Sequence, residues 1–226
     1  MDTSAKGLLA VWTDVEPAAE ADFNAWYDGE HLAERAAIAG FLNARRYLAV
    51  DSAPRYFAAY DTERLATLGA PTYAKALANQ SDWSRRVMAH FRNPTRMIAA
   101  LAAEHGTGIG GAMLTLRLGL AGGRAAEIAA ALGEHLAGNV VGRPGIVRCC
   151  LAVGVVAGLA DEAQTTAARA AEAPDTAALL VEGTALAPLQ EVAAGPLRAQ
   201  TLLDVGAGDL QQSGFYRLHY AIVGAP

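Results

Sequence analysis

A weak internal repeat with an offset of about 104 residues constrains the fold more than any other feature of the chain. Three short matches occur at nearly the same offset, which is improbable in a shuffled sequence of this composition. The chain is therefore expected to contain two copies of one structural unit. The matched segments are Glu30-His31-Leu32-Ala33 with Glu134-His135-Leu136-Ala137, Gly40-Phe41 with Gly145-Ile146, and Leu48-Ala49-Val50 with Leu151-Ala152-Val153.

The hydrophobic pattern supports the repeat, because each half reads as strand, helix, strand, strand, helix, strand. This is the order of the split unit in ferredoxin-like folds. We expect a first unit over residues 1–105 and a second, degenerate unit over residues 112–226, joined by a hinge. The expected elements of the first half are strands 7–13, 41–50, 55–61 and 93–100 and helices 22–38 and 63–79. Those of the second half are strands 113–120, 146–156, 177–183 and 215–223 and helices 124–137 and 188–203.

Four antiparallel strands with helices on one face leave the other face apolar and in need of a cover. The fold class predicted here is therefore α+β, with two tandem ferredoxin-like β-α-β-β-α-β units packed sheet to sheet. One chain then supplies both halves of the assembly.

Charge and hydropathy narrow the function classes. The formal net charge is −5, which favours neither nucleic acid nor an anionic membrane surface as a partner. The apolar runs fall well short of the roughly 20 residues needed to cross a bilayer, and the first residues show no secretory pattern. We expect a cytoplasmic protein. The two cysteines, Cys149 and Cys150, are adjacent and poorly placed for a disulfide or a metal site.

Aromatic residues are concentrated in the first half. All three Trp, four of the five Phe and five of the seven Tyr precede Gly111. This bias indicates that the first unit retains a ligand pocket while the second serves as scaffold. The alternative is that the first unit simply packs around larger side chains.

The expected first helix combines these aromatics with charged groups. At 100° per residue, one face gathers Phe23, Trp26, Tyr27, Glu30, Glu34 and Ile38, and His31 lies at its edge. Carboxylates among aromatic side chains require either a solvated pocket or a cationic partner such as Arg35, Arg45 or Arg46.

His31 allows two interpretations. It follows Tyr27 by one helical turn and can act as an acid or base near neutral pH. It can equally be a hydrogen-bonded histidine at the edge of the core. His135 repeats the position without the aromatic context, because Ala130 and Ala131 replace Trp26 and Tyr27. This repetition mildly favours a structural role.

The motif Trp26-Tyr27-Asp28-Gly29-Glu30-His31, followed by Gly40-Phe41 and Arg45-Arg46-Tyr47, resembles the EthD-like branch of the dimeric α/β-barrel superfamily. The resemblance covers roughly residues 6–100. It implies a ligand cavity between the first helix and the sheet, with the family's motif histidine at His31 and its wall at Trp26 and Tyr27. Relatives in that superfamily include lyases, isomerases, cyclases, dehydratases and cofactor-independent monooxygenases that act on small or aromatic compounds.

These observations predict a cofactor-independent enzyme for a small hydrophobic or aromatic, carbonyl-bearing compound, with His31 and Tyr27 as catalytic residues. The predicted substrate-binding residues are Trp12, Trp26, Glu30, Arg46 and Tyr47. The alternative is a non-catalytic barrel protein that binds a small molecule or serves in assembly, and a homodimer is compatible with either. No metal or organic cofactor motif occurs. A third alternative is a haem protein, for which His219 on the last expected strand is the candidate ligand.

Overall fold

The computed structural model describes residues 4–120, 123–155 and 176–224. Within these ranges, the strands form one closed barrel in the order β1-β3-β2-β8-β5-β7-β6-β4, and every neighbouring pair is antiparallel. The strands are β1 (Gly7–Val15), β2 (Phe41–Ala49), β3 (Tyr56–Thr62), β4 (Phe91–Gly106), β5 (Ala112–Leu120), β6 (Ile146–Gly154), β7 (Thr176–Gly183) and β8 (Ala207–Val223). The structure is therefore of the α+β class.

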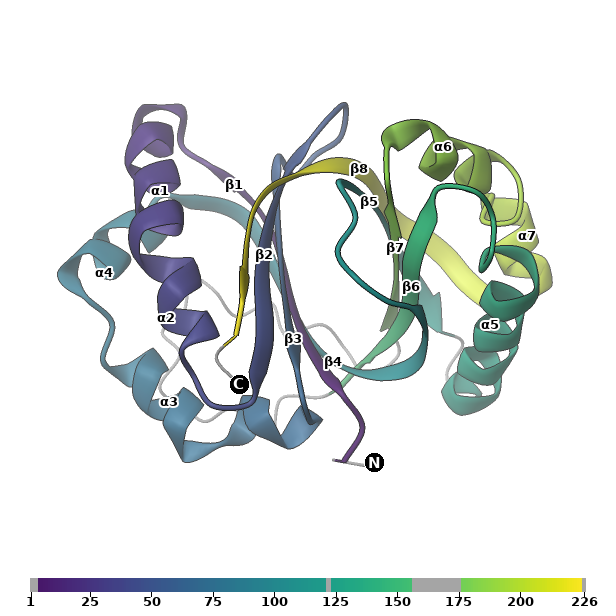
Figure 1. Cartoon of the computed structure of the whole chain (residues 1–226), viewed down its shortest axis with the longest axis horizontal. Coiled ribbons are helices and arrows are strands. Elements are labelled where there is room, and N and C mark those ends of the chain that lie inside the picture. Colours follow the sequence, from purple (N-terminus) through teal and green to yellow (C-terminus); the bar gives the residue numbers. More distant parts are fainter. Residues whose placement is uncertain (1–3, 121–122, 156–175, 225–226) are drawn as a thin grey trace.

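Helices cover two opposite flanks of the barrel (Figure 1). The first flank carries η1 (Pro17–Ala19), α1 (Glu20–Trp26), η2 (Tyr27–His31), α2 (Leu32–Ala36), η3 (Leu65–Gly69), α3 (Pro71–Ala78) and α4 (Asp82–Met88). The second carries α5 (Ala125–Asn139), α6 (Leu186–Ala194) and α7 (Ala199–Asp204). In the described part of the chain, none of these helices has the length and apolarity that a bilayer crossing requires.

The two long strands β4 and β8 close the barrel. β4 pairs with β1 through residues 91–100 and with β6 through residues 99–106. β8 pairs with β5 through residues 207–217 and with β2 through residues 216–223. Each of these two strands therefore extends beyond its own half of the barrel and hydrogen-bonds to a strand of the other half. The strands of the two halves are therefore joined by backbone hydrogen bonds at both edges, between β2 and β8 and between β4 and β6. The sequence predicted only that two separate sheets pack face to face.

Three hydrophobic clusters follow from the alternation of side chains along the strands. One fills the barrel interior and includes Trp12, Tyr47, Phe57 and Tyr216. A second lies between the first-flank helices and the sheet. The third lies between the second-flank helices and the sheet. The sheet is therefore covered on both faces, which explains its nearly continuous apolar strands.

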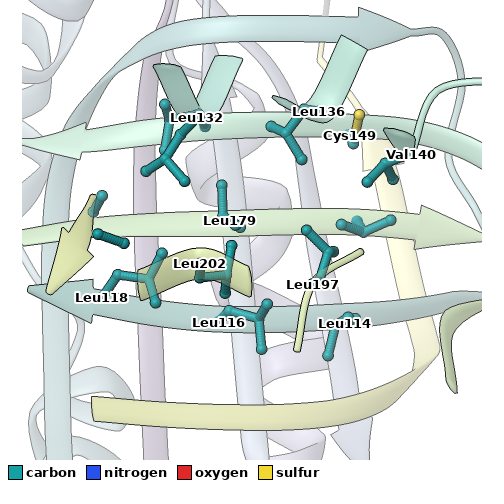
Figure 2. Packing of buried hydrophobic residues seen from close by; sticks show 14 of the residues in the cluster. Leu114, Leu116, Leu118, Leu132, Leu136, Val140, Cys149, Leu179, Leu197 and Leu202 are labelled. Carbon is teal, nitrogen blue, oxygen red and sulfur yellow. The ribbon is translucent and has the colours of Figure 1, made fainter. Parts of the chain in front are cut away.

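The third cluster is aliphatic. Leu132 and Leu136 lie on α5, which packs against β4 and β6, and the cluster continues through Leu179 of β7 and Leu116 of β5 to Leu202 of α7 (Figure 2). All five side chains are at most 3% exposed. Leucine side chains of this kind contribute about 1.5–3 kcal/mol each when fully buried. The second half thus has a packed scaffold where the first half has aromatic and polar groups.

Three expected helices are interrupted. The helix expected over 22–38 contains a π-helical turn at Tyr27–His31 and ends at Ala36. The helix expected over 63–79 divides into η3 and α3, because Ala70 is extended before Pro71. The helix expected over 188–203 divides into α6 and α7 around Gly195. In the last two cases a proline or glycine at the break accounts for the difference.

Candidate active site between the first helix and the sheet

The segment α1–η2–α2 places the predicted site residues against the sheet. Glu20 and Asp22 lie in the first turn of α1, where negative charge complements the helix dipole. The π-helical turn η2 then adds an extra residue to the spiral between Tyr27 and His31. Turns of this type often occur at functional sites, because they redirect side chains without ending the helix.

Aromatic rings fix the position of the His31 imidazole. It stacks on the Trp26 indole with ring centroids 4.2 Å apart and meets the Tyr27 ring edge-on at 5.2 Å. Tyr60 of β3 approaches edge-on at 6.2 Å. Trp26 is itself anchored, because its Nε1 donates to Ser84 Oγ at 2.9 Å. The imidazole is therefore held by packing on three sides.

The Nδ1 atom of His31 is buried and has no hydrogen-bond partner among the described residues, while the residue as a whole is partly exposed. Burial and the positive charge of Arg35 hold the pKa of His31 well below its usual range. The imidazole is therefore neutral near pH 7. In the tautomer with hydrogen on Nε2, Nδ1 carries a free lone pair.

Two phenols border this imidazole. Burial raises the pKa of Tyr27 and raises that of Tyr60 further. Both therefore remain protonated near neutral pH and can serve as hydrogen-bond donors. This arrangement places one neutral base beside neutral hydroxyl groups.

Glu30 is bound to α4. Its Oε1 accepts hydrogen bonds from Ser81 Oγ at 2.5 Å and Ser84 Oγ at 3.0 Å. Ser81 is also the N-cap of α4 and accepts from the Ser84 backbone. The Glu30 carboxylate therefore connects η2 to α4 and already has hydrogen-bond partners within the protein.

Arg46 of β2 points to the same side of the sheet, and its guanidinium is enclosed by protein groups. Its Nη1 donates to Asp28 Oδ1 at 3.0 Å, and its Nη2 donates to Asn24 Oδ1. The rings of Phe23, Tyr27 and Tyr56 lie 4.6–5.1 Å from Cζ. Asp28 and these faces stabilise the buried charge.

Trp12 and Tyr47 lie on the other face of the sheet, inside the barrel. Both are fully buried, and both pack on Phe57, with centroids 4.9 Å and 5.7 Å away. Arg46 and Tyr47 are consecutive in a strand and so must face opposite sides. The structure brings Trp26, Tyr27, Glu30, His31 and Arg46 together and separates Trp12 and Tyr47 from them.

Arg35 is a site residue that the sequence prediction did not include. It lies one helical turn after His31 and is 4% exposed. Its Nε and Nη1 have no hydrogen-bond partner within residues 4–120, 123–155 and 176–224. The nearby ring is that of Tyr73, 5.9 Å from Cζ. The i, i+4 spacing from His31 is the signal that would have identified it.

A polar cavity of about 330 Å³ lies at one end of the barrel, and none of the predicted site residues lines it. It is bordered by the loop 106–109 and by a buried network of charges. Arg45 donates to Asp61 at 2.8 Å and to Glu182, and Arg148 bonds to Asp61 at 3.1 Å and to Glu182 at 2.9 Å. The opposite charges of these side chains compensate one another, and the ion pairs connect strands of the two halves.

Comparisons with known proteins identify the fold. No protein-family model matches the chain, and no curated protein matches its sequence. Solved structures match over nearly the whole length. An anthrone oxidase-like protein superposes with a TM-score of 0.67 at 12% identity, over 100% of this chain and 95% of that chain. A proposed monooxygenase from Fusobacterium nucleatum has a TM-score of 0.64 at 8% identity, over 97% and 95%.

A haem-binding protein from Thermus thermophilus also superposes, with a TM-score of 0.56 at 8% identity, over 96% of this chain and 92% of that chain. At such identities, similarity establishes the fold alone. The chain therefore shares the α+β barrel fold of these structures, which is the type of fold that the sequence predicts.

His219, the predicted candidate ligand, does not lie in a setting that suits a haem. His219 lies on β8 near the surface, with Nε2 3.3 Å from Asp28 Oδ2, whereas a haem ligand faces an apolar slot. His135 Nε2 is bonded to the Pro196 carbonyl at 2.7 Å. In the described ranges, no three His, Cys, Asp or Glu side chains are grouped to hold a metal ion.

Proposed function

We propose that this protein is a cofactor-independent enzyme that transfers a proton on a small hydrophobic or aromatic, carbonyl-bearing compound, with His31 as the general base. The observation that supports this most directly is the neutral imidazole whose buried Nδ1 lacks a partner in the described structure. An unbonded basic nitrogen in a desolvated site is costly as a core feature and useful as a proton acceptor.

The proposed step is a simple proton transfer. Nδ1 of His31 takes the proton from an acidic C–H bond next to the carbonyl group, and the bonding electrons move to the carbonyl oxygen as an enolate. Return of the proton to another atom then completes an isomerisation or prepares an elimination. Trp26 and Tyr27 orient the imidazole, and the Tyr27 hydroxyl serves as a hydrogen-bond donor toward the bound compound.

The EthD-like assignment belongs to the same proposal. Its support is the motif Trp26-Tyr27-Asp28-Gly29-Glu30-His31, together with the location of these residues on one side of the sheet. The proposal also includes a two-unit organisation, with units over 1–105 and 112–226. The strand order supports it. In the barrel, the four strands of the first half follow the order β4-β1-β3-β2 and those of the second half follow β8-β5-β7-β6, so in each half the order is fourth, first, third, second.

Anthrone is a suitable probe, because it appears in the name of a structural neighbour and its methylene group ionises to an aromatic enolate. Exchange of this methylene hydrogen for deuterium, followed by NMR in anaerobic buffer, measures the proposed step without requiring a complete reaction. We expect the wild-type protein to accelerate the exchange, and His31→Gln to reduce this acceleration about 10²–10⁴-fold.

His135→Gln is the matched control, because both ring nitrogens of His135 lie within hydrogen-bond distance of protein atoms. It should change the exchange rate less than twofold. Equal rates for the two variants would show that His31 is not the base. Binding of anthrone without accelerated exchange would instead establish the non-catalytic alternative.

A further inference from the structure

Arg35 differs from the other buried arginines of the protein. Arg45, Arg46 and Arg148 each donate to at least one carboxylate within hydrogen-bond distance. The carboxylate nearest to Arg35 is Glu34, 3.6 Å from Nη2, and the Glu34 side chain is 40% exposed. Two of the three guanidinium nitrogens therefore have no partner in the part of the chain that the structure describes.

A buried guanidinium in this state is expensive for the fold. A charge removed from water requires an opposite charge and hydrogen bonds to offset the lost solvation. The ring of Tyr73 at 5.9 Å offsets only a small part of that loss. Because arginine keeps its proton under all ordinary conditions, it cannot lower this cost by becoming neutral.

We infer that Arg35 is the anion-binding residue of the site, and that the bound compound carries an anionic oxygen, either a carboxylate or the oxygen that becomes an enolate or phenolate. This inference rests on the proposed function for the reaction, and its own evidence is the pair of buried guanidinium nitrogens, Nε and Nη1, that lack a partner among the described residues. The planar donors of Arg35 suit two oxygen atoms or one oxygen with two lone pairs. Tyr60 and Tyr73 supply aromatic walls beside it.

Anion binding would also activate the base. The charge of Arg35 is one cause of the lowered pKa of His31. An anionic oxygen on Arg35 neutralises that charge, so the affinity of Nδ1 for a proton increases when the compound is bound. The titratable groups that face Arg35 and His31 are Tyr27 of η2, Tyr60 of β3, Tyr73 of α3 and Glu34 of α2. Of these only Glu34 is a carboxylic acid.

Benzoate and its neutral isostere benzamide test the inference without knowledge of the natural compound. We expect titration calorimetry to show at least tenfold tighter binding of benzoate by the wild-type protein. Arg35→Gln should abolish this preference, and Arg35→Lys should retain part of it. Arg124→Gln, at an exposed arginine on the opposite flank, removes the same formal charge and should leave the preference unchanged.

The His31 imidazole provides a second readout. Saturating benzoate should shift its nitrogen resonances in the wild type and not in Arg35→Gln. Thermal melting tests for a structural role, because removal of a buried charge that the protein compensates only in part should leave the Arg35→Gln melting midpoint equal or higher. Equal affinity for both probes, or a preference that survives in Arg35→Gln, would overturn the inference. His31→Gln should keep the benzoate preference, so failure of the proposed base is distinguishable from failure of the anion site.

Discussion

The imidazole of His31 lies over the indole of Trp26, with ring centroids 4.2 Å apart and planes inclined by 30°. Trp26 is held in turn by its hydrogen bond to Ser84, and Ser84 donates to Glu30 at 3.0 Å. The orientation of the candidate base thus depends on a chain of contacts that ends in α4. Glu30 therefore contacts the support of Trp26 through Ser84.

Trp26 should be important for both stability and the orientation of His31. Replacement of a fully buried tryptophan by alanine removes its packing, and we expect Trp26→Ala to lower the free energy of unfolding by about 3–5 kcal/mol. Trp26→Phe keeps an aromatic face under the imidazole and should lose considerably less. Urea denaturation of both variants checks this difference, and equal losses would contradict the proposed stacking role.

His31 should also produce a pH dependence of stability. Its pKa is depressed in the folded state, so below the unfolded value of about 6.5 the unfolded chain binds a proton that the folded chain does not. Stability is therefore complete above that value and is lost as the pH falls. Between pH 7.5 and 5.5 the wild type should therefore lose more stability than His31→Gln. Identical pH profiles from denaturant titrations would refute the depressed pKa.

Much of the fold was predictable because it depends on hydrophobic periodicity. The lengths of β4 and β8 were not predictable, because the far end of each strand pairs with the other half of the barrel. The expected strand 93–100 covers the segment that pairs with β1, and the remainder of β4 pairs with β6. Local propensity contains no information on such long-range pairing.

The site was predictable only on the helix. Helical spacing places Trp26, Tyr27 and His31 on one surface, and the structure agrees with that geometry. On the strands, a choice of Trp12 and Tyr47 together with Arg46 ignores the alternation between faces. The i, i+4 spacing places Arg35 next to His31, but the lack of partners for two of its nitrogens could not be recognised from the sequence, because it depends on the neighbours in three dimensions.

The adjacent cysteines should be chemically inert in the folded protein. Both are 1% exposed, and burial raises the pKa of Cys149 to about 11 and that of Cys150 to about 12. The thiolate is the reactive form, so at pH 8 their modification by a disulfide reagent should be more than about 100-fold slower than in denaturant. Rapid reaction of either thiol in the native protein would contradict this burial.

The charge network at the barrel end should contribute to closure of the barrel. Glu182 of β7 accepts from Arg45 of β2 and Arg148 of β6, and its Oε2 accepts from the Gly110 backbone at 2.8 Å. Asp61 of β3 bonds to the same two arginines. Although burial alone would raise the pKa of Asp61, these arginines lower it below its ordinary value. Asp61 is therefore charged near neutral pH, and its bonds to Arg45 and Arg148, with those of Glu182, connect strands of different halves.

Removal of one charge from this network should destabilise the protein, because the remaining buried charges are then incompletely compensated. Glu182→Gln keeps the shape of the side chain but leaves two buried arginines with one fewer negative charge, so we expect a loss of about 3–5 kcal/mol in the free energy of unfolding. Glu127→Gln, at an exposed carboxylate paired with Arg124, should not change the denaturation midpoint measurably. If Glu182→Gln behaves like this control, the network is not a structural connection, and its arginines become available to a ligand in the adjoining cavity.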